Sequence, residues 1–424
     1  MDKLGKTYQA YQRMLIEELV PAMGCTEPIA IAYCAACARE ALGELPDVVT
    51  IGVSGNILKN AKSVVVPNTG GLIGVEASAA AGIVAGDASK ELEVISCVSE
   101  QQKLQINEFL SSADFCVSPT YGTELLEVIV RVKKGTHYAS AHIKQGHANV
   151  VHVEKDGNVL MQKDDAKQLD QADDKHLLNI ADIVAFAEAA DLEDVRPSLQ
   201  RQIEFNSAIS NAGLTGDWGI NMGKLLLETR GSSRRTKAIA AAAAGADARM
   251  SGCELPVIIV SGSGNQGITA SMPVIAYADE LGKPEDELLR ALIVSNLVAL
   301  HTKSGVGKMS AFCGAMCAGA GAGAGIAYLS GANAEEIAET VSNSLGIISG
   351  MVCDGAKPSC ASKVAYAVDC GILGYEMCKN GKRFQGGEGI IARDVEQTIR
   401  NVGRMAKEGM AETDHVIQAI MTES

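Results

Sequence analysis

Two cysteines, Cys353 and Cys360, flank a short loop in the stretch GMVCDGAKPSCASKV, residues 350–364. Gly355 and Pro358 lie between them, so the chain turns at this point. The pair could be a redox couple, a set of metal ligands, or two small apolar residues near a bend. Thiolates that bind iron–sulfur clusters typically lie on such loops, where backbone N–H groups can hydrogen-bond sulfur. Cys313, at the start of another predicted helix, would supply a third thiolate.

A second candidate is the glycine- and serine-rich stretch VSGSGNQGITA, residues 260–270. It follows a short apolar run and precedes a predicted helix, so free N–H groups at the helix start, with Ser261, Ser263 and Asn265, would form an anion-binding cradle. The alternative is a plain strand-to-helix turn. The stretch also resembles the phosphate loop of pyridoxal-phosphate serine dehydratases. That cofactor needs a Schiff-base lysine in its own motif, and none is convincing here, so no pyridoxal phosphate (PLP) is expected.

Two residues are candidates for proton transfer. Cys25, in PAMGCTEP, lies just before a predicted helix, and a helix N-terminus lowers the pKa of a thiol. This position predicts that Cys25 is a reactive thiolate, with a buried turn cysteine as the alternative. His147, in QGHANVVH, could act as an acid or base, although a histidine satisfied within a strand is commoner.

The stretch SGNILKNAKSVVVPNTGG, residues 54–71, gathers amide and ammonium groups that suit a carboxylate ligand. The alternative for its lysine is a solvated position on the surface. The candidate substrate-binding residues are Asn56, Lys59, Asn60, Asn68 and Thr69.

The elements that must position these residues divide the chain into two regions. Hydrophobic periodicity predicts helices over 5–19 and from Pro28 to about 42, strands at 48–54, 63–68 and 92–96, and a helix near 100–112. Four alternating runs at 126–163 predict an antiparallel meander. The charged stretch 163–175 is the predicted linker, and the rest of the chain is predicted to be helical, with the last helix at about 391–412. We therefore expect an α+β fold, with an α+β domain over 1–165 and a helical catalytic domain over 175–424. The first two helices could pack on the second domain.

Composition narrows the class of function. The chain has 424 residues, of which 47% are hydrophobic and 21% charged, as in ordinary globular proteins. A net charge of −14 argues against nucleic acids and anionic membranes as partners. The Ala/Gly-rich segment 309–331 fits a tightly packed internal helix better than a membrane span. No signal peptide is evident, so a cytoplasmic location is expected and the twelve cysteines are not expected to form a disulfide framework.

Taken together, the motifs resemble a known family. GCTEP, SGNILKN, VPNTG, GHANVVH, DARM, SGSGNQGITA, SAFCGAM, GMVCDGAKPSCASKV and GGEGI occur in this order. They are similar to the L-cysteine desulfidase family, which is related to the catalytic alpha part of iron–sulfur L-serine dehydratases. The resemblance implies a [4Fe–4S] cluster on Cys313, Cys353 and Cys360, with one iron open to substrate. It also implies that Cys25 is the catalytic base or a reversible fourth ligand.

The resemblance implies β-elimination of L-cysteine to hydrogen sulfide, pyruvate and ammonia. The alternative in the same class is dehydration of L-serine, and a different class is an iron–sulfur sensor that binds cysteine without turnover. Lys59 and His147 complete the expected catalytic set with Cys25. We expect a small amino acid as the partner, and neither nucleic acid nor a membrane. The sequence does not decide whether the protein forms a homodimer.

Overall fold

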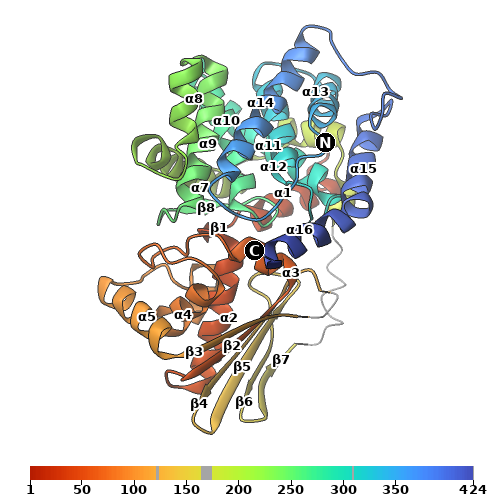
Figure 1. Cartoon of the computed structure of the whole chain (residues 1–424). Coiled ribbons are helices and arrows are strands. Elements are labelled where there is room, and N and C mark those ends of the chain that lie inside the picture. Colours follow the sequence, from red (N-terminus) through yellow and green to blue (C-terminus); the bar gives the residue numbers. More distant parts are fainter. Residues whose placement is uncertain (121–123, 164–173, 308–309, 424) are drawn as a thin grey trace.

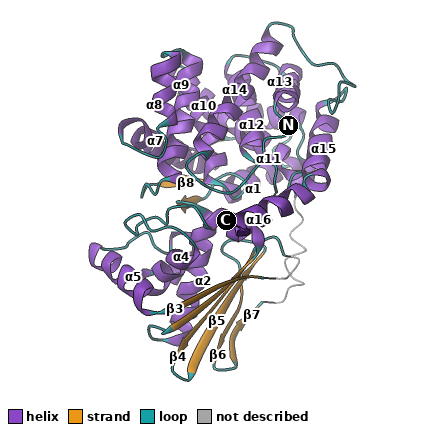
Figure 2. Cartoon of the chain, viewed as in Figure 1, coloured by secondary structure: helices purple, strands orange, loops and turns teal. Residues whose placement is uncertain are grey.

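The protein, seen here as a computed structural model, has a β-sheet region and a larger helical region that meet face to face (Figure 1). The structure describes residues 1–120, 124–163, 174–307 and 310–423. Most of the predicted linker at 163–175 lies outside the described residues. The α+β class is confirmed, because a mixed sheet lies in the N-terminal part and the C-terminal part is helical (Figure 2).

The sheet region contains six hydrogen-bonded strands in the order β3-β2-β4-β5-β6-β7. Strand β2 pairs with β3 in parallel and with β4 antiparallel, and the remaining pairs are antiparallel. The strands are β2 (Val48–Val53), β3 (Asp114–Pro119), β4 (Glu127–Lys134), β5 (His137–Lys144), β6 (Val150–Lys155) and β7 (Asn158–Gln162). The predicted meander is therefore confirmed as β4 to β7.

Helices cover one face of this sheet. They are α2 (Thr26–Leu42), α3 (Gly55–Ala61), α4 (Val75–Ala85), the 3-10 turn η1 (Ala88–Glu93) and α5 (Glu100–Ser112). Alternation along β4 explains the packing: Val128, Val130 and Val132 are fully buried, whereas Arg131 between them is exposed. The apolar face of the sheet therefore lies under α2.

The helical region begins with α1 (Lys6–Glu18) and resumes after the sheet with η3 (Asp174–Leu177). Its other helices are α6 (Ile180–Ala189), α7 (Leu192–Thr215), α8 (Met222–Arg230), α9 (Arg234–Met250), α10 (Gly264–Leu281), α11 (Glu285–Ser304), α12 (Ala315–Leu329), α13 (Ala334–Ile347), α14 (Cys360–Lys379), α15 (Val395–Arg404), the π-helical turn η4 (Met405–Gly409) and α16 (Ala411–Glu423). Two short strands, β1 (Pro21–Met23) and β8 (Pro256–Ile258), pair antiparallel and connect the regions.

Helix α12, with the sequence AMCAGAGAGAGIAYL, packs against α10, α11 and α14. Its small residues let neighbouring backbones approach closely: a Cβ at Gly319 would lie 2.3 Å from the carbonyl oxygen of Ala367. The segment is thus an internal helix, as predicted. Across the described ranges, no helix is both long and apolar enough to cross a membrane.

The apolar core has two main parts. One lies among the helices and includes Tyr11 and Leu15 of α1, and the other lies between the sheet and α2, where Ile29 and Ile31 are fully buried. The first helix therefore packs on the helical region. The second helix, α2, does not pack on the helical region, as the sequence analysis had allowed, because it covers the sheet.

Three local predictions were wrong. Residues 63–68 form turns with one isolated bridge at Val65, and residues 92–96 form the end of η1 and a turn. The predicted helix over 391–412 is interrupted, since η4 separates α15 from α16. In each case neighbouring elements bury the apolar residues. Their spacing in the sequence therefore indicates which side chains are buried, and it does not show that the backbone forms a regular strand or helix.

Candidate active site

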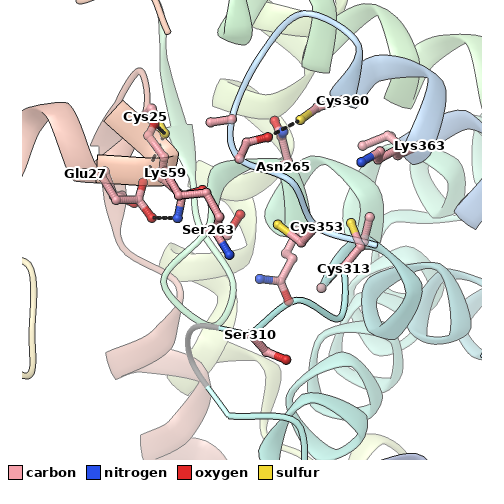
Figure 3. A pocket seen from close by; sticks show the side chains of 18 of the residues that line it. Cys25, Glu27, Lys59, Ser263, Asn265, Ser310, Cys313, Cys353, Cys360 and Lys363 are labelled. Atoms are coloured by element: carbon pink, nitrogen blue, oxygen red, sulfur yellow. Dashed lines mark hydrogen bonds between the residues drawn. The ribbon is translucent and has the colours of Figure 1, made fainter. Parts of the chain in front are cut away.

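A cavity of about 120 Å³ lies where the two regions meet. The sheet region contributes the start of α2 and one face of α3, and the helical region contributes the starts of α10, α12 and α14 (Figure 3). Nine of the residues predicted for the site line this cavity: Cys25, Asn56, Lys59, Asn60, Ser263, Asn265, Cys313, Cys353 and Cys360.

The β1–β8 ladder aligns two of the predicted loops. Pro21 pairs with Ile258 and Met23 with Pro256, so the strand that leads to Cys25 and the strand that leads to the SGSGN loop lie side by side and run in opposite directions. The hydroxyl of Thr26 donates to the carbonyl oxygen of Gly262 at 3.3 Å, which joins the two loops directly. Two stretches more than two hundred residues apart in sequence thus share one wall of the cavity.

Helix α3 presents a polar face to the cavity. Asn56, Lys59 and Asn60 are spaced three and four residues apart, which places them on the same side of the helix. Lys59 is 2% exposed, and its Nζ lies 2.6 Å from Oδ1 of Asp414 on α16. The solvated-surface alternative for Lys59 is therefore wrong.

The three candidate ligand thiols come from two adjacent segments. The N–H of Cys313 donates to the carbonyl oxygen of Met351 at 2.9 Å, and that of Cys353 donates to Ala311 at 2.6 Å. This short ladder places Cys313 beside Cys353, and Figure 3 shows both on the side of the cavity opposite Cys25. Cys360 begins α14, and its thiol donates to the carbonyl oxygen of Gly355 at 3.6 Å.

The thiols differ in how readily they ionise. A hydrogen bond with Cys313 lowers the pKa of Cys353 against the effect of burial, and the nearby Lys59 and Lys303 lower it further. The same hydrogen bond, together with burial, raises the pKa of Cys313. Burial raises the pKa of Cys360. Of the three, Cys353 is therefore the thiol that most readily becomes a thiolate.

The loop between Cys353 and Cys360 is held by a close backbone contact with α3 and by ion pairs of Asp354. Gly355 has φ +95°, and a Cβ there would lie 2.3 Å from the carbonyl oxygen of Lys59, so only glycine permits this approach to α3. Asp354 pairs with Lys357 at 2.6 Å and also with Lys363. Burial alone would raise the pKa of Asp354, but the two ammonium groups outweigh it and lower the pKa to about 2.

Cys25 is 4% exposed, and its thiol donates to Oε2 of Glu27 at 3.0 Å. Burial, and then the Glu27 charge, raise the pKa of Cys25 well above its ordinary value. The prediction that the helix N-terminus makes Cys25 a thiolate is therefore wrong for the protein without ligand. Burial and an adjacent carboxylate outweigh the helix dipole.

Glu27 connects Cys25 to His147. Its Oε1 accepts from Nδ2 of Asn60 at 3.1 Å and lies 3.8 Å from Nε2 of His147, which is an ion-pair distance rather than a hydrogen bond. Burial raises the pKa of Glu27, but His147 and the Cys25 thiol outweigh it, and the pKa falls to about 2. Sequence reasoning did not place Glu27 in the site, although its position two residues after Cys25 was a usable signal.

Several cavity residues were not predicted from the sequence, namely Glu27, Arg249, Gln266, Lys303 and Lys363. Arg249 is 3% exposed and its Nη1 donates to Oδ1 of Asn265 at 3.1 Å. Three buried polar atoms around this wall have no hydrogen-bond partner in the described structure: Nε of Arg249, Oε1 of Gln266 and Oδ1 of Asn56. One unpaired donor and two unpaired acceptors are the pattern that a small zwitterion would satisfy.

Four predicted residues do not line this cavity. Asn68 donates to the carbonyl oxygen of Ile95 at 2.8 Å, and Thr69 donates to that of Val66 at 2.7 Å, so both side chains stabilise turns. Their predicted contact with substrate is not supported, because neither residue lines the cavity and the Asn68 Nδ2 and the Thr69 hydroxyl already have backbone partners. Ser261 and His147 line a second, adjoining cavity, which shares Glu27, Ser263 and Gln266 with the first.

The donor set fits an iron–sulfur cluster better than a single metal ion. Among the described residues, no three His, Cys, Asp or Glu side chains lie close enough together to hold one ion. A cluster is larger, and its thiolates converge from separate loops onto one inorganic core. Cys313 comes from one segment and Cys353 and Cys360 from a second, and the three line one cavity that they share with the buried cations Lys59, Arg249 and Lys303.

Comparison with known proteins places the chain in a family. The family model described as serine dehydratase alpha chain matches residues 89–419. A UPF0597 protein of Desulfitobacterium hafniense (strain Y51) is 53% identical over 422 residues, covering 99% of this chain and 98% of the relative. UPF0597 proteins of Lachnoclostridium phytofermentans and Finegoldia magna are 49% and 47% identical, covering 98% and 97% of this chain and 99% of each relative.

The matched segment contains Arg249, the SGSGN loop and the three candidate ligand cysteines. The start of α2 with Cys25 and the face of α3 lie before it, and the full-length relatives span these parts too. The family model covers most of the chain, and the chain belongs to the serine dehydratase alpha chain family, in which it is a serine dehydratase-like protein.

Proposed function

We propose that the protein is an iron–sulfur-dependent lyase that eliminates the β-substituent of a small L-amino acid, with L-cysteine as the first candidate substrate. The observation that carries this proposal is the convergence of Cys313, Cys353 and Cys360 on one cavity with buried polar atoms that lack partners. The family match supports a lyase of the serine dehydratase type. The reaction consumes water and yields hydrogen sulfide, pyruvate and ammonia, with no net oxidation or reduction.

In this proposal Cys313, Cys353 and Cys360 hold a [4Fe–4S] cluster. When bound, the cluster supplies an open iron that acts as a Lewis acid on the leaving group at Cβ. Thiolate sulfur suits such iron, which is the physical reason for placing L-cysteine ahead of L-serine. The chain's own residues must bind the amino acid, orient it and remove the proton from Cα.

Arg249 is the proposed contact for the substrate carboxylate. Its guanidinium is buried, already oriented by Asn265, and retains an unpaired Nε–H. Arginine binds a carboxylate with parallel hydrogen bonds, which also fixes orientation. The free acceptors Oδ1 of Asn56 and Oε1 of Gln266 then suit the substrate ammonium group. Ser263 and Asn60 complete the polar lining.

Cys25 is the proposed base for the Cα proton, with Glu27 and His147 as its route to solvent. The thiol must first lose its own proton, and Glu27 accepts a hydrogen bond from it at 3.0 Å. His147, 3.8 Å beyond Glu27, faces the second cavity. Arg249 acts to lower the pKa of Cys25, but burial and the Glu27 charge outweigh it in the protein without ligand, so in this proposal the thiolate forms only once substrate is bound.

L-Serine is the second candidate substrate, and the description of the matched family favours it. The same residues would then act, with water as the leaving group in place of sulfide. A protein that binds cysteine without turnover is the candidate from a different class. These candidates differ in products and not in the location of the site.

The test is an anaerobic assay of the iron- and sulfide-reconstituted protein with each amino acid. Sulfide and pyruvate in equal amounts from L-cysteine would support the first candidate, whereas pyruvate from L-serine alone would support the second. Absence of pyruvate from both would refute the lyase proposal. The proposed absence of pyridoxal phosphate predicts that borohydride treatment leaves activity intact.

A further inference from the structure

Lys303 is a buried lysine that the reaction outlined above does not use. It lies in the last turn of α11, is 4% exposed, and lines the thiol cavity. Two other lysines line this cavity, and each has a carboxylate partner: Lys59 pairs with Asp414, and Lys363 pairs with Asp354. Within the described ranges, Lys303 has neither a carboxylate within ion-pair distance nor a side-chain hydrogen bond.

Lys303 shares the cavity lining with Cys313 and Cys353. Burial lowers the pKa of Lys303, and the charges of Cys317, Cys353 and Cys313 oppose this effect, in that order. Cys317 lies one turn after Cys313 on α12 and is fully buried behind the cavity. Lys303 therefore lies near the Cys313 and Cys353 thiols, whereas Arg249 is held by Asn265.

A lone ammonium group in such a place is costly unless an anion joins it, because burial removes its hydration. Three thiolates would bring three negative charges into the same space, and the inorganic core of a cluster would offset only part of them. Lys59 also lies near Cys353, but Asp414 at 2.6 Å already compensates its charge. Of the three cavity lysines, Lys303 is thus the one whose ammonium group has no carboxylate partner in the described structure and can pair with an added anion.

We propose that Lys303 is the fixed counter-charge of the cluster bound by Cys313, Cys353 and Cys360, and that its ammonium group retains the cluster and does not bind substrate. This inference rests on the proposed function, since it requires that the chain binds a cluster. It assigns Lys303 a positioning and retention role. The residue has opposite effects in the two states: it destabilises the metal-free protein and stabilises the loaded one.

The experiment compares wild type with Lys303→Met, which keeps the length of the side chain without its charge, and Lys303→Arg, which keeps the charge. The matched control is Lys237→Met, which removes a lysine of α9 that pairs with Glu280 at the surface. Each protein is reconstituted anaerobically with ferrous iron and sulfide. Iron per chain, visible absorbance and the rate of iron loss to a chelator are measured, together with the Tm of each metal-free form.

Lys303→Met should lose iron about tenfold faster than wild type, as is typical when a group supporting the ligands is removed, whereas Lys303→Arg and Lys237→Met should stay close to wild type. Metal-free Lys303→Met should have a higher Tm than metal-free wild type, because the unpaired charge is gone. An unchanged rate of iron loss, or a lower Tm in the metal-free form, would overturn the inference. Failure of wild type itself to bind iron would refute the proposed function instead.

Discussion

Nζ of Lys59 and Oδ1 of Asp414 lie 2.6 Å apart, although 355 residues separate them in the sequence. Lys59 belongs to the sheet region and lines the cavity, and Asp414 belongs to α16 near the end of the chain, which Figure 1 shows beside α3. Gln418, one turn after Asp414, donates to Oδ2 of Asp414 at 2.8 Å. The C-terminal helix therefore holds a cavity lysine in place.

Asp414→Asn should destabilise the fold by about 3 kcal/mol, because it leaves the Lys59 ammonium group buried without a counter-charge. Lys59→Met should cost less, since Asp414 keeps some contact with solvent. The free energy of unfolding in urea measures both effects, and the double variant should recover part of the loss. Glu412→Gln, on the same helix but exposed, is the control and should change stability little. Equal stability of Asp414→Asn and this control would contradict the prediction.

The cysteines should fall into two groups when each is replaced by Ala. Loss of Cys313, Cys353 or Cys360 should abolish the visible absorbance of the reconstituted protein and most of its iron. Loss of Cys25 should leave the iron and abolish turnover. Cys317→Ala is the matched control: it is buried one turn from Cys313 but does not line the cavity, so it should keep its iron. If Cys25→Ala loses iron like the first group, Cys25 is a cluster ligand and its assignment as the base fails.

Arg249→Met should raise KM for the amino acid about 10- to 100-fold, the range expected when a hydrogen bond to a charged group is removed. Iron content should not change, because Arg249 is not one of the proposed cluster ligands. Arg234→Met, an exposed position at the other end of α9, serves as the control. A large fall in kcat with KM unchanged would show that Arg249 acts elsewhere in the reaction.

Asp247 should make the protein less stable as pH rises. It is 1% exposed, and burial raises its pKa from 3.8 to about 6, even though its Oδ2 accepts from the N–H of Met222 at 2.5 Å. The folded chain therefore binds more protons than the unfolded chain between these values, so stability falls as pH rises through this window. Above pH 6 the full cost is present, on the order of 3 kcal/mol.

Asp247→Asn removes this titration, so its stability relative to wild type should increase from pH 4 to pH 6 and then level off. Urea unfolding at a series of pH values measures the difference. Asp194→Asn, at an exposed position of α7, should give a curve parallel to that of wild type. A parallel curve for Asp247→Asn as well would show that the carboxyl group has an ordinary pKa in the folded chain.

Regular alternation made the sheet predictable. The meander from β4 to β7 followed from runs such as LEVIVRVK, in which Val128 and Val130 point inward and Arg131 points outward. Strand β3 was missed because an edge strand buries few side chains, and its residues are mostly exposed. Helix α3 was also missed, since its seven residues are too few to show a period.

Motifs identified the thiol side of the site better than the cationic side. Cys353 and Cys360 stand on an unusual loop, whereas Lys303 lies in the last turn of a helix, where a lysine ordinarily faces water. Only the packing of α11 against α12 turns it into a cavity residue. Likewise, no local pattern predicts that Arg249 meets Asn265, because the packing of α9 against α10 brings them together.

The pairing of β1 with β8 also has a consequence for how the protein is made. It joins a segment synthesised at the start of the chain to one synthesised more than halfway along, and such distant contacts form slowly. Neither core alone encloses the cavity, since its walls come from both. The cavity, and with it the proposed site for a cluster, is therefore complete only in chains that have finished folding.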